Sequence, residues 1–212
     1  MDGPDDDTLL NRALLYLNQQ GEYKENDLYT PALCHRLDTG TSGLVIIAKT
    51  PEAEELFLAA IKSREVKKTY LCVTFGRPMP PDATLGGYLL KDADRGIVKI
   101  VEDKQPGARD VETRYETIAV SGRLALLKVQ LITGRTHQIR VHMASIHHPV
   151  AGDPVYGPHN CITSLHGQCL HAKTLGFVHP ITGEQLRFDS ELPDYFTRFL
   201  TTLRQRTGGN NE

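Results

Sequence analysis

An aspartate stands in a polar, glycine-punctuated segment where a carboxylate could do chemistry. Asp38 lies within residues 35–43, which read His-Arg-Leu-Asp-Thr-Gly-Thr-Ser-Gly and directly precede the aliphatic residues 44–48. Rigid scaffolds commonly place catalytic groups on such loops at strand edges. The carboxylate of Asp38 could therefore be a nucleophile, a general base or a metal ligand. The structural alternative is an aspartate that binds its own turn through Thr39 and Thr41.

A second segment concentrates basic side chains without an acid. Residues 133–142 read Thr-Gly-Arg-Thr-His-Gln-Ile-Arg-Val-His, and Gly-Asp-Pro-Val-Tyr-Gly follows at 152–157. We expect Thr136 to cap a short helix, whose free backbone N–H groups could bind a phosphate. The segment therefore indicates an anion site. The alternative, that Arg135 and Arg140 are solvated or paired with nearby acids, stays open.

The late histidines and cysteines raise the question of a metal site. Eight of the nine histidines lie at or after position 137. A cluster is formed by His159, Cys161, His166, Cys169 and His171. Its spacing lacks the paired ligands of zinc sites, so we favour structural roles and expect no metal. The sequence also has no glycine-rich phosphate loop and no G-x-S-x-G elbow, which argues against a nucleotide cofactor and the common hydrolases.

The composition is that of a globular protein with an uneven distribution of charge. The chain has 212 residues, of which 40% are hydrophobic and 24% charged. The longest aliphatic run, 44–48, is too short to cross a bilayer, so we expect a cytoplasmic protein that does not span membranes. Residues 1–30 hold seven acids and two bases, a net charge of −5, so the other 182 residues carry +3. Basic stretches over 61–77 and 122–143 could face a polyanion, or could be ordinary solvated surfaces.

Periodicity predicts a mixture of helices and strands around these motifs. A first helix includes residues 9–17, behind acids at 5–7 that can cap it, and a second begins at Thr50-Pro51. A short helix follows Thr136, and a last one begins at Pro193. Strands are expected over 44–48, 69–75, 97–101, 111–119, 124–131, 170–178 and 185–188, with turns between them.

Together, the motifs closely resemble the RluA family of pseudouridine synthases. The resemblance rests on residues 35–43, the triplet Lys-Thr-Tyr at 68–70 and residues 131–157, and it runs from about residue 8 to 199. It implies an α+β fold, with a mixed, largely antiparallel sheet flanked by helices and a central RNA-binding cleft. The catalytic domain would span 1–206, and 207–212 would be a disordered tail. The implied reaction is the isomerisation of uridine to pseudouridine in structured ribosomal or transfer RNA, by a monomer without cofactor or metal.

The resemblance assigns a catalytic role to three residues. Asp38 matches the catalytic aspartate, as a nucleophile or as the partner of an oxocarbenium-like state. Arg140 matches the arginine that pairs with it, and a guanidinium can bind a carboxylate through two parallel hydrogen bonds. Tyr70 matches a tyrosine that lies against the target base, and Ile139 an aliphatic residue that would pack on the uracil face. A phenol of ordinary pKa, about 10, is a poor base without tuning.

Further residues would bind RNA. The target base must leave the stack, and Arg36 matches the residue that fills the gap. Contacts to RNA, or support of the cleft, are expected from His35, Thr41, Lys68, Arg135, His137 and Gln138. Lys62, Arg64 and Lys67 could extend a track for the RNA backbone, or could be a solvated helix end.

Two departures from the family pattern stand out. His147 occupies a position that is usually glycine, so its turn would be strained if it needs a positive φ. Relatives also begin with a strand that carries Lys-Pro-x-Gly, which residues 1–30 lack. One competing hypothesis is therefore a truncated RNA-binding relative with weak catalysis. The other is a zinc hydrolase that uses the late histidines.

Overall fold

The computed structural model describes residues 7–92, 96–158, 167–198 and 200–201. The chain divides into two compact units. The first consists of Met1–Arg36, Val45–Glu65 and Val178–Leu186, and the second of Leu37–Leu44, Val66–Phe177 and Arg187–Glu212. The domain over 1–206 and the tail over 207–212 stay predictions, since residues 202–212 lie outside the described part of the chain.

The first helix of the first unit begins at a threonine cap. α1 spans Leu9–Gln19, and Thr8 Oγ1 accepts the backbone N–H of Asn11 at 3.1 Å. Of the acids at 5–7 that were expected to cap this helix, residues 5 and 6 lie outside the described part of the chain, and Thr8 rather than Asp7 occupies the cap position. The carboxylate of Asp7 binds the guanidinium of Arg12 through two hydrogen bonds instead, so it does not reach the backbone at the helix start.

The second helix follows its sequence signals closely. α2 spans Pro51–Lys62, and Thr50 Oγ1 accepts the N–H of Ala53 at 3.2 Å, as predicted. Proline fits the first turn because its missing N–H has no helical partner there. The unit also holds a two-stranded antiparallel sheet of β1 (Ala32–Leu33) and β3 (Ile47–Ala48).

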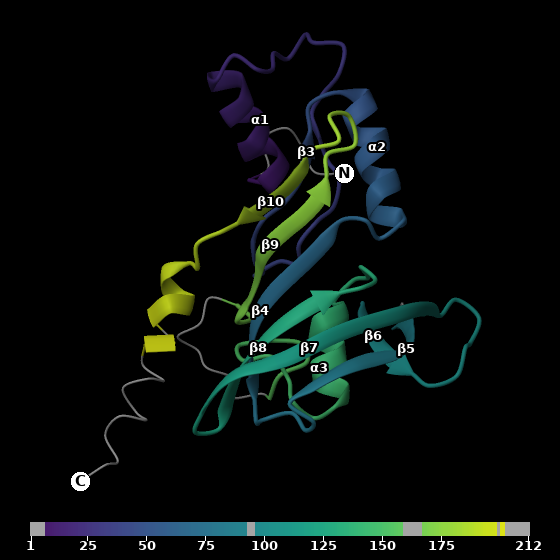
Figure 1. The fold of residues 1–212 in the computed structure, drawn as a ribbon, viewed down its shortest axis with the longest axis vertical. Coiled ribbons are helices and arrows are strands. Elements are labelled where there is room, and N and C mark those ends of the chain that lie inside the picture. Colours follow the sequence, from purple (N-terminus) through teal and green to yellow (C-terminus); the bar gives the residue numbers. More distant parts are fainter. Residues whose placement is uncertain (1–6, 93–95, 159–166, 199, 202–212) are drawn as a thin grey trace. The chain divides into compact units, whose positions relative to one another are not determined.

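The second unit is built on a mixed sheet of eight strands. Their order is β10-β9-β4-β8-β7-β5-β6, with β2 paired to β9 (Figure 1). Neighbours from β9 to β6 are antiparallel, whereas β2 is parallel to β9. The strands are β2 (Ser42–Gly43), β4 (Lys67–Phe75), β5 (Asp82–Asp92), β6 (Ile97–Val101), β7 (Arg109–Ser121), β8 (Leu124–Leu131), β9 (Leu170–Val178) and β10 (Gln185–Asp189).

Two strand predictions are wrong. The eleven-residue strand β5 was expected to be turn, because Gly86 and Gly87 interrupt its pattern. Of the strand expected over 44–48, only Ile47–Ala48 (β3) is a strand, which pairs with β1, and a second short strand, β2, precedes it at Ser42–Gly43 and pairs with β9. Gly43 has φ +117°, and a Cβ there would approach the backbone oxygen of Ala172 within 2.3 Å, so the pairing of β2 with β9 requires glycine at this position.

Helices cover both faces of this sheet. α3 spans Gln138–Ser145 and lies against the sheet (Figure 1). Its Ile139 and Met143 pack against buried side chains of β4, β7 and β8, including Tyr70. On the opposite face, Phe196 from the helical residues 194–198 packs against Val73 of β4. The expected α+β class, with a mixed and largely antiparallel sheet flanked by helices, is confirmed.

Histidines occupy both ends of α3. The expected cap Thr136 is wrong, since the residue before the helix is His137, with φ 54° and no side-chain capping bond. At the other end His147 has φ 64°. Its N–H donates to Ala144 O and the next N–H, of His148, donates to Met143 O, which is a Schellman ending with a non-glycine residue in the left-handed position. The expected strain at His147 is therefore present.

Candidate active site

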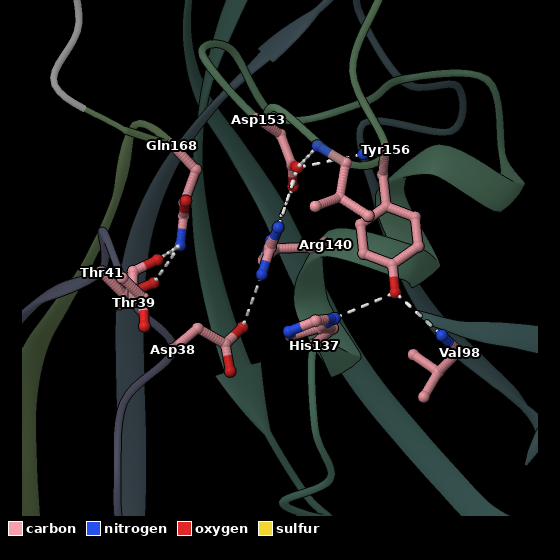
Figure 2. A network of polar contacts seen from close by, with 10 residues as sticks. Asp38, Thr39, Thr41, Val98, His137, Arg140, Asp153, Tyr156 and Gln168 are labelled. Carbon is pink, nitrogen blue, oxygen red and sulfur yellow. Dashed lines mark hydrogen bonds and ion pairs between the residues drawn. The ribbon is translucent and has the colours of Figure 1, made fainter. Parts of the chain in front are cut away.

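Arg140 joins two aspartates at the start of α3 (Figure 2). Its Nε and Nη2 donate to the two carboxylate oxygens of Asp153, at 2.7 and 2.9 Å. Its Nη1 donates to Asp38 Oδ2 at 3.3 Å. The predicted partnership of Arg140 with Asp38 is thus present, but as one long hydrogen bond. The two parallel bonds expected for it go to Asp153 instead.

The two carboxylates differ in their surroundings. The side chain of Asp153 is fully buried, whereas that of Asp38 is 21% exposed. Burial acts to raise the pKa of Asp153, but hydrogen bonds from Arg140 and from the N–H groups of Tyr156 and Val155 outweigh it and lower that pKa. Burial likewise acts to lower the pKa of Arg140, and both carboxylates together raise it. Arg140 therefore stays charged, and Asp38 is the partner that a ligand could reach.

Tyr156 ties this group to the sheet. Its ring lies 5.3 Å from the guanidinium carbon of Arg140, a cation–π contact. Its hydroxyl accepts the N–H of Val98 in β6 at 3.0 Å and is 3.0 Å from His137 Nδ1 (Figure 2). The backbone N–H of the same residue donates to Asp153 Oδ1 at 3.0 Å. Tyr156 thus contacts the arginine and its buried carboxylate at once.

The loop that carries Asp38 is held by Gln168, which lies just before β9, and by the pairing of β2 with β9. Gln168 Nε2 donates to Thr39 O at 2.9 Å and to Thr41 Oγ1 at 2.8 Å. The N–H of Thr41 donates to the backbone oxygen of Asp38. Gly40 allows the close approach, since a Cβ there would lie 2.9 Å from Gln168 Oε1. The structural alternative for Asp38 is wrong, because its side chain points to Arg140 rather than into its own turn (Figure 2).

Tyr70 and Lys68 lie on β4. Tyr70 is 6% exposed and packs in the same cluster as Ile139. Burial, with a contribution from the charge of Asp38, raises the pKa of Tyr70 well above its usual value. Its hydroxyl is therefore protonated at neutral pH. Burial lowers the pKa of Lys68, whose Nζ lies beside Gly134, 3.2 Å from where a Cβ would stand.

Gln138 supports the segment before α3. Its Oε1 accepts the hydroxyl of Thr133 at 2.8 Å and the N–H of Arg135 at 3.0 Å. Its Nε2 donates to Glu112 O at 3.0 Å and to Thr113 Oγ1 at 2.9 Å. The backbone donor of Arg135 fixes the orientation of the amide. All four hydrogen bonds are made within the protein, which favours a supporting role.

The other predicted RNA-binding residues are placed as follows. His35 and Arg36 belong to the first unit, whereas Arg140 belongs to the second. His35 Nε2 accepts the N–H of Ile46 at 3.2 Å, and Arg36 is exposed. Arg135 is exposed, and Thr41 and His137 are partly buried and hydrogen-bonded as described above.

The described residues contain neither a metal-binding cluster nor a membrane-spanning helix. No three His, Cys, Asp or Glu side chains of that part of the chain are grouped to hold a metal ion. His159, Cys161 and His166 of the late cluster lie outside it. Among the described helices, none has the length and apolarity that a membrane span requires.

Sequence reasoning missed the role of Asp153, and with it those of Tyr156 and Gln168. A signal was available: Asp153 is the single acidic residue between Glu116 and Glu184. A buried arginine in such a segment needs a local anion, because an unpaired buried charge is costly.

Comparison with known proteins identifies the family. Residues 5–145 match the family model described as RNA pseudouridylate synthase. The chain belongs to this family. The resemblance to RluA-type pseudouridine synthases is thereby confirmed. Similar proteins include relatives named ribosomal large subunit pseudouridine synthase D.

Relatives within the pseudouridylate synthase family are longer than this chain. An uncharacterized RNA pseudouridine synthase of Chloroflexus aurantiacus is 39% identical over 177 residues, which cover 83% of this chain and 54% of that protein. The ribosomal large subunit pseudouridine synthase D of Zymomonas mobilis is 38% identical over 195 residues, which cover 89% of this chain and 61% of that protein. The chain thus spans less than two thirds of either relative.

A solved structure supports the fold of this pseudouridylate synthase family member. Human RNA pseudouridylate synthase domain containing 4 superposes with a TM-score of 0.75, over 95% of this chain and 85% of that one. The two sequences are 24% identical, so the likeness concerns the fold.

Proposed function

We propose that this chain isomerises uridine to pseudouridine in RNA. The observation that carries the proposal is the partly exposed carboxylate of Asp38, held by Arg140 in a member of the pseudouridylate synthase family. Several relatives are named ribosomal large subunit pseudouridine synthase D. We therefore take large-subunit ribosomal RNA as the first substrate to test and transfer RNA as the second.

The reaction rearranges bonds without an oxidant or reductant. The bond between N1 of uracil and C1′ of ribose breaks, a bond between C5 and C1′ forms, C5 loses its proton and N1 gains one. Asp38 acts at C1′, as a nucleophile or as the counter-charge of an oxocarbenium-like state. Arg140 is the cation beside this carboxylate and orients it through the hydrogen bond from Nη1.

Tyr70 and Ile139 form the apolar side of the proposed site. Both pack in one buried cluster beside Asp38. A tyrosine that keeps its proton at neutral pH is a poor general base, so in the proposal its ring packs against the uracil. Water is excluded from the reacting atoms by the same apolar surface.

The proposed RNA contacts follow the resemblance to the family. The target base must leave the stack, and Arg36 is the residue proposed to fill the gap. Lys68 and Arg135 are proposed to contact phosphates, together with His35, Thr41 and His137. Gln138 and Ile139 act from within the protein. The monomeric state and the cytoplasmic location stay predictions.

The test is the formation of pseudouridine in unmodified RNA. Large-subunit ribosomal RNA and transfer RNA, transcribed in vitro, are incubated with the protein, and pseudouridine is mapped by mass spectrometry after selective chemical derivatisation, because the isomerisation itself leaves the mass unchanged. The wild type should form product, and Asp38→Asn should form none. Asp110→Asn is the matched control, since it removes an exposed carboxylate of β7.

Two outcomes count against the proposal. Equal product from the wild type and Asp38→Asn would exclude Asp38 as the reacting group. Salt-dependent RNA binding without product, by a folded wild type, would favour the non-catalytic RNA-binding alternative.

A further inference from the structure

Asp153 is bound so tightly that it has little freedom to move. Its Oδ1 accepts three hydrogen bonds, from Val155 N–H at 2.8 Å, Tyr156 N–H at 3.0 Å and Arg140 Nη2 at 2.9 Å. The turn that follows closes through Gly157, whose N–H donates to Asp153 O. A Cβ at Gly157 would lie 2.4 Å from that oxygen. The backbone of this turn therefore fixes the plane of the carboxylate.

That plane in turn fixes the plane of Arg140. A guanidinium bound through two parallel hydrogen bonds is coplanar with its carboxylate, so one pair sets the direction of every other N–H. The ring of Tyr156 lies against the same group. The remaining edge of the guanidinium, which carries Nη1, faces Asp38.

We propose that Asp153 is a positioning residue of the reaction proposed above. It holds the guanidinium of Arg140 so that Nη1 alone meets Asp38. Asp153 is also the stronger partner of the arginine, because its two hydrogen bonds are shorter than the single bond to Asp38. Asp38 is thus oriented without being held in a full ion pair, and its second oxygen stays available to the ribose. This inference rests on the proposed function.

Two substitutions separate charge from position. Asp153→Asn removes the charge but keeps an oxygen that can accept from Val155 and Tyr156. Asp153→Glu keeps the charge and moves the carboxylate outward by one methylene. Asp7→Asn is the matched control, because Asp7 binds Arg12 through the same two-bond geometry on the exposed surface of the first unit.

The experiment reads the arginine directly and then its effect on turnover. The Nε–H of Arg140 is followed by ¹⁵N NMR through its exchange with water, and kcat and KM are measured on the RNA that the wild type modifies. In the wild type we expect a slowly exchanging Nε–H. Both Asp153 variants should lose about 100-fold in kcat, the scale of a misplacement near 1 Å, with KM close to that of the wild type. Asp153→Asn should also speed the exchange, and Asp7→Asn should change neither.

Each result decides the inference. Wild-type kcat in Asp153→Glu would overturn it, whether or not Asp153→Asn folds. A change confined to KM would overturn it as well, since it would show a role in RNA binding. If the wild type forms no pseudouridine, the proposed function fails, and the NMR measurement alone decides: unchanged exchange in Asp153→Asn overturns the anchoring of Arg140, and faster exchange supports it.

Discussion

Asp153 holds Arg140 through two short hydrogen bonds from thirteen residues further along the chain, in a site where neither side chain is more than 4% exposed. A buried pair of this kind contributes little net stability, because desolvation offsets the attraction. Losing one partner is different, since the remaining charge is then buried alone. The energetics of the pair can therefore be separated from its proposed part in turnover.

Removal of one partner should destabilise the protein more than removal of both. Arg140→Met leaves Asp153 unpaired and should lower the free energy of unfolding by about 3–5 kcal/mol. In Arg140→Met with Asp153→Asn, the amide oxygen can still accept the backbone N–H groups, so most of the loss should be recovered. Urea unfolding at pH 7 measures both. Additive losses in the double variant would contradict the buried-charge explanation.

Acid should weaken the fold through His142. Burial lowers the pKa of this ring to about 4, from 6.5. Between these values the unfolded chain binds a proton at His142 and the folded chain does not, so the free energy of unfolding falls as pH falls from 6.5 to 4. The full effect is about 3 kcal/mol. His142→Gln should flatten this part of the profile, whereas His147→Gln, an exposed control, should keep it.

Glycine at position 147 should stabilise the protein. His147 has a left-handed backbone conformation, which costs a non-glycine residue about 1–2 kcal/mol. Glycine removes this cost, but part of the gain is offset because glycine also raises the conformational entropy of the unfolded chain. We expect His147→Gly to raise the free energy of unfolding by about 0.5–1 kcal/mol in urea titrations. His147→Ala keeps a Cβ and should give no such gain. Equal stabilisation by both would point to the imidazole instead.

Gln168 should control the order of the loop that carries Asp38. Gln168→Glu replaces the donor of two hydrogen bonds with a carboxylate that repels Thr39 O, at a cost of about 1–3 kcal/mol. The N–H of Thr41, which donates to Asp38 O, should then exchange faster with solvent. Hydrogen exchange by NMR tests this, with Gln105→Glu as an exposed control. Unchanged protection at Thr41 would show that the pairing of β2 with β9 holds the loop alone.

Local signals predicted those elements whose stability is local. α2 was placed correctly because Thr50 and Pro51 satisfy its first turn without help from the rest of the chain. β5 was missed because Gly86 and Gly87 have low strand propensity, and pairing with β7 overrides it. Two-residue strands such as β2 depend on the backbone of a distant partner, which periodicity cannot reveal.

The sequence predicted most residues of the candidate site but not all of the hydrogen bonds between them. The motifs brought Asp38, Tyr70 and Arg140 together, and the structure places them in one unit. The stronger partner of Arg140 was not foreseen, because the choice between two carboxylates depends on which one the fold buries. The isolated acid at position 153 was the available clue.

Residues 37–44 belong to the second unit, although the chain before them and the segment Val45–Glu65 after them belong to the first. Asp38 and Arg140 therefore belong to the same compact unit, yet a segment of the first unit lies between them in the sequence. A contiguous fragment that contains both must also contain Val45–Glu65, and one that begins at Val66 lacks the aspartate. A shortened version that keeps both residues but only the second unit would require a rewired chain, with residues 37–44 joined to Val66 by a new linker, rather than a truncation at either end.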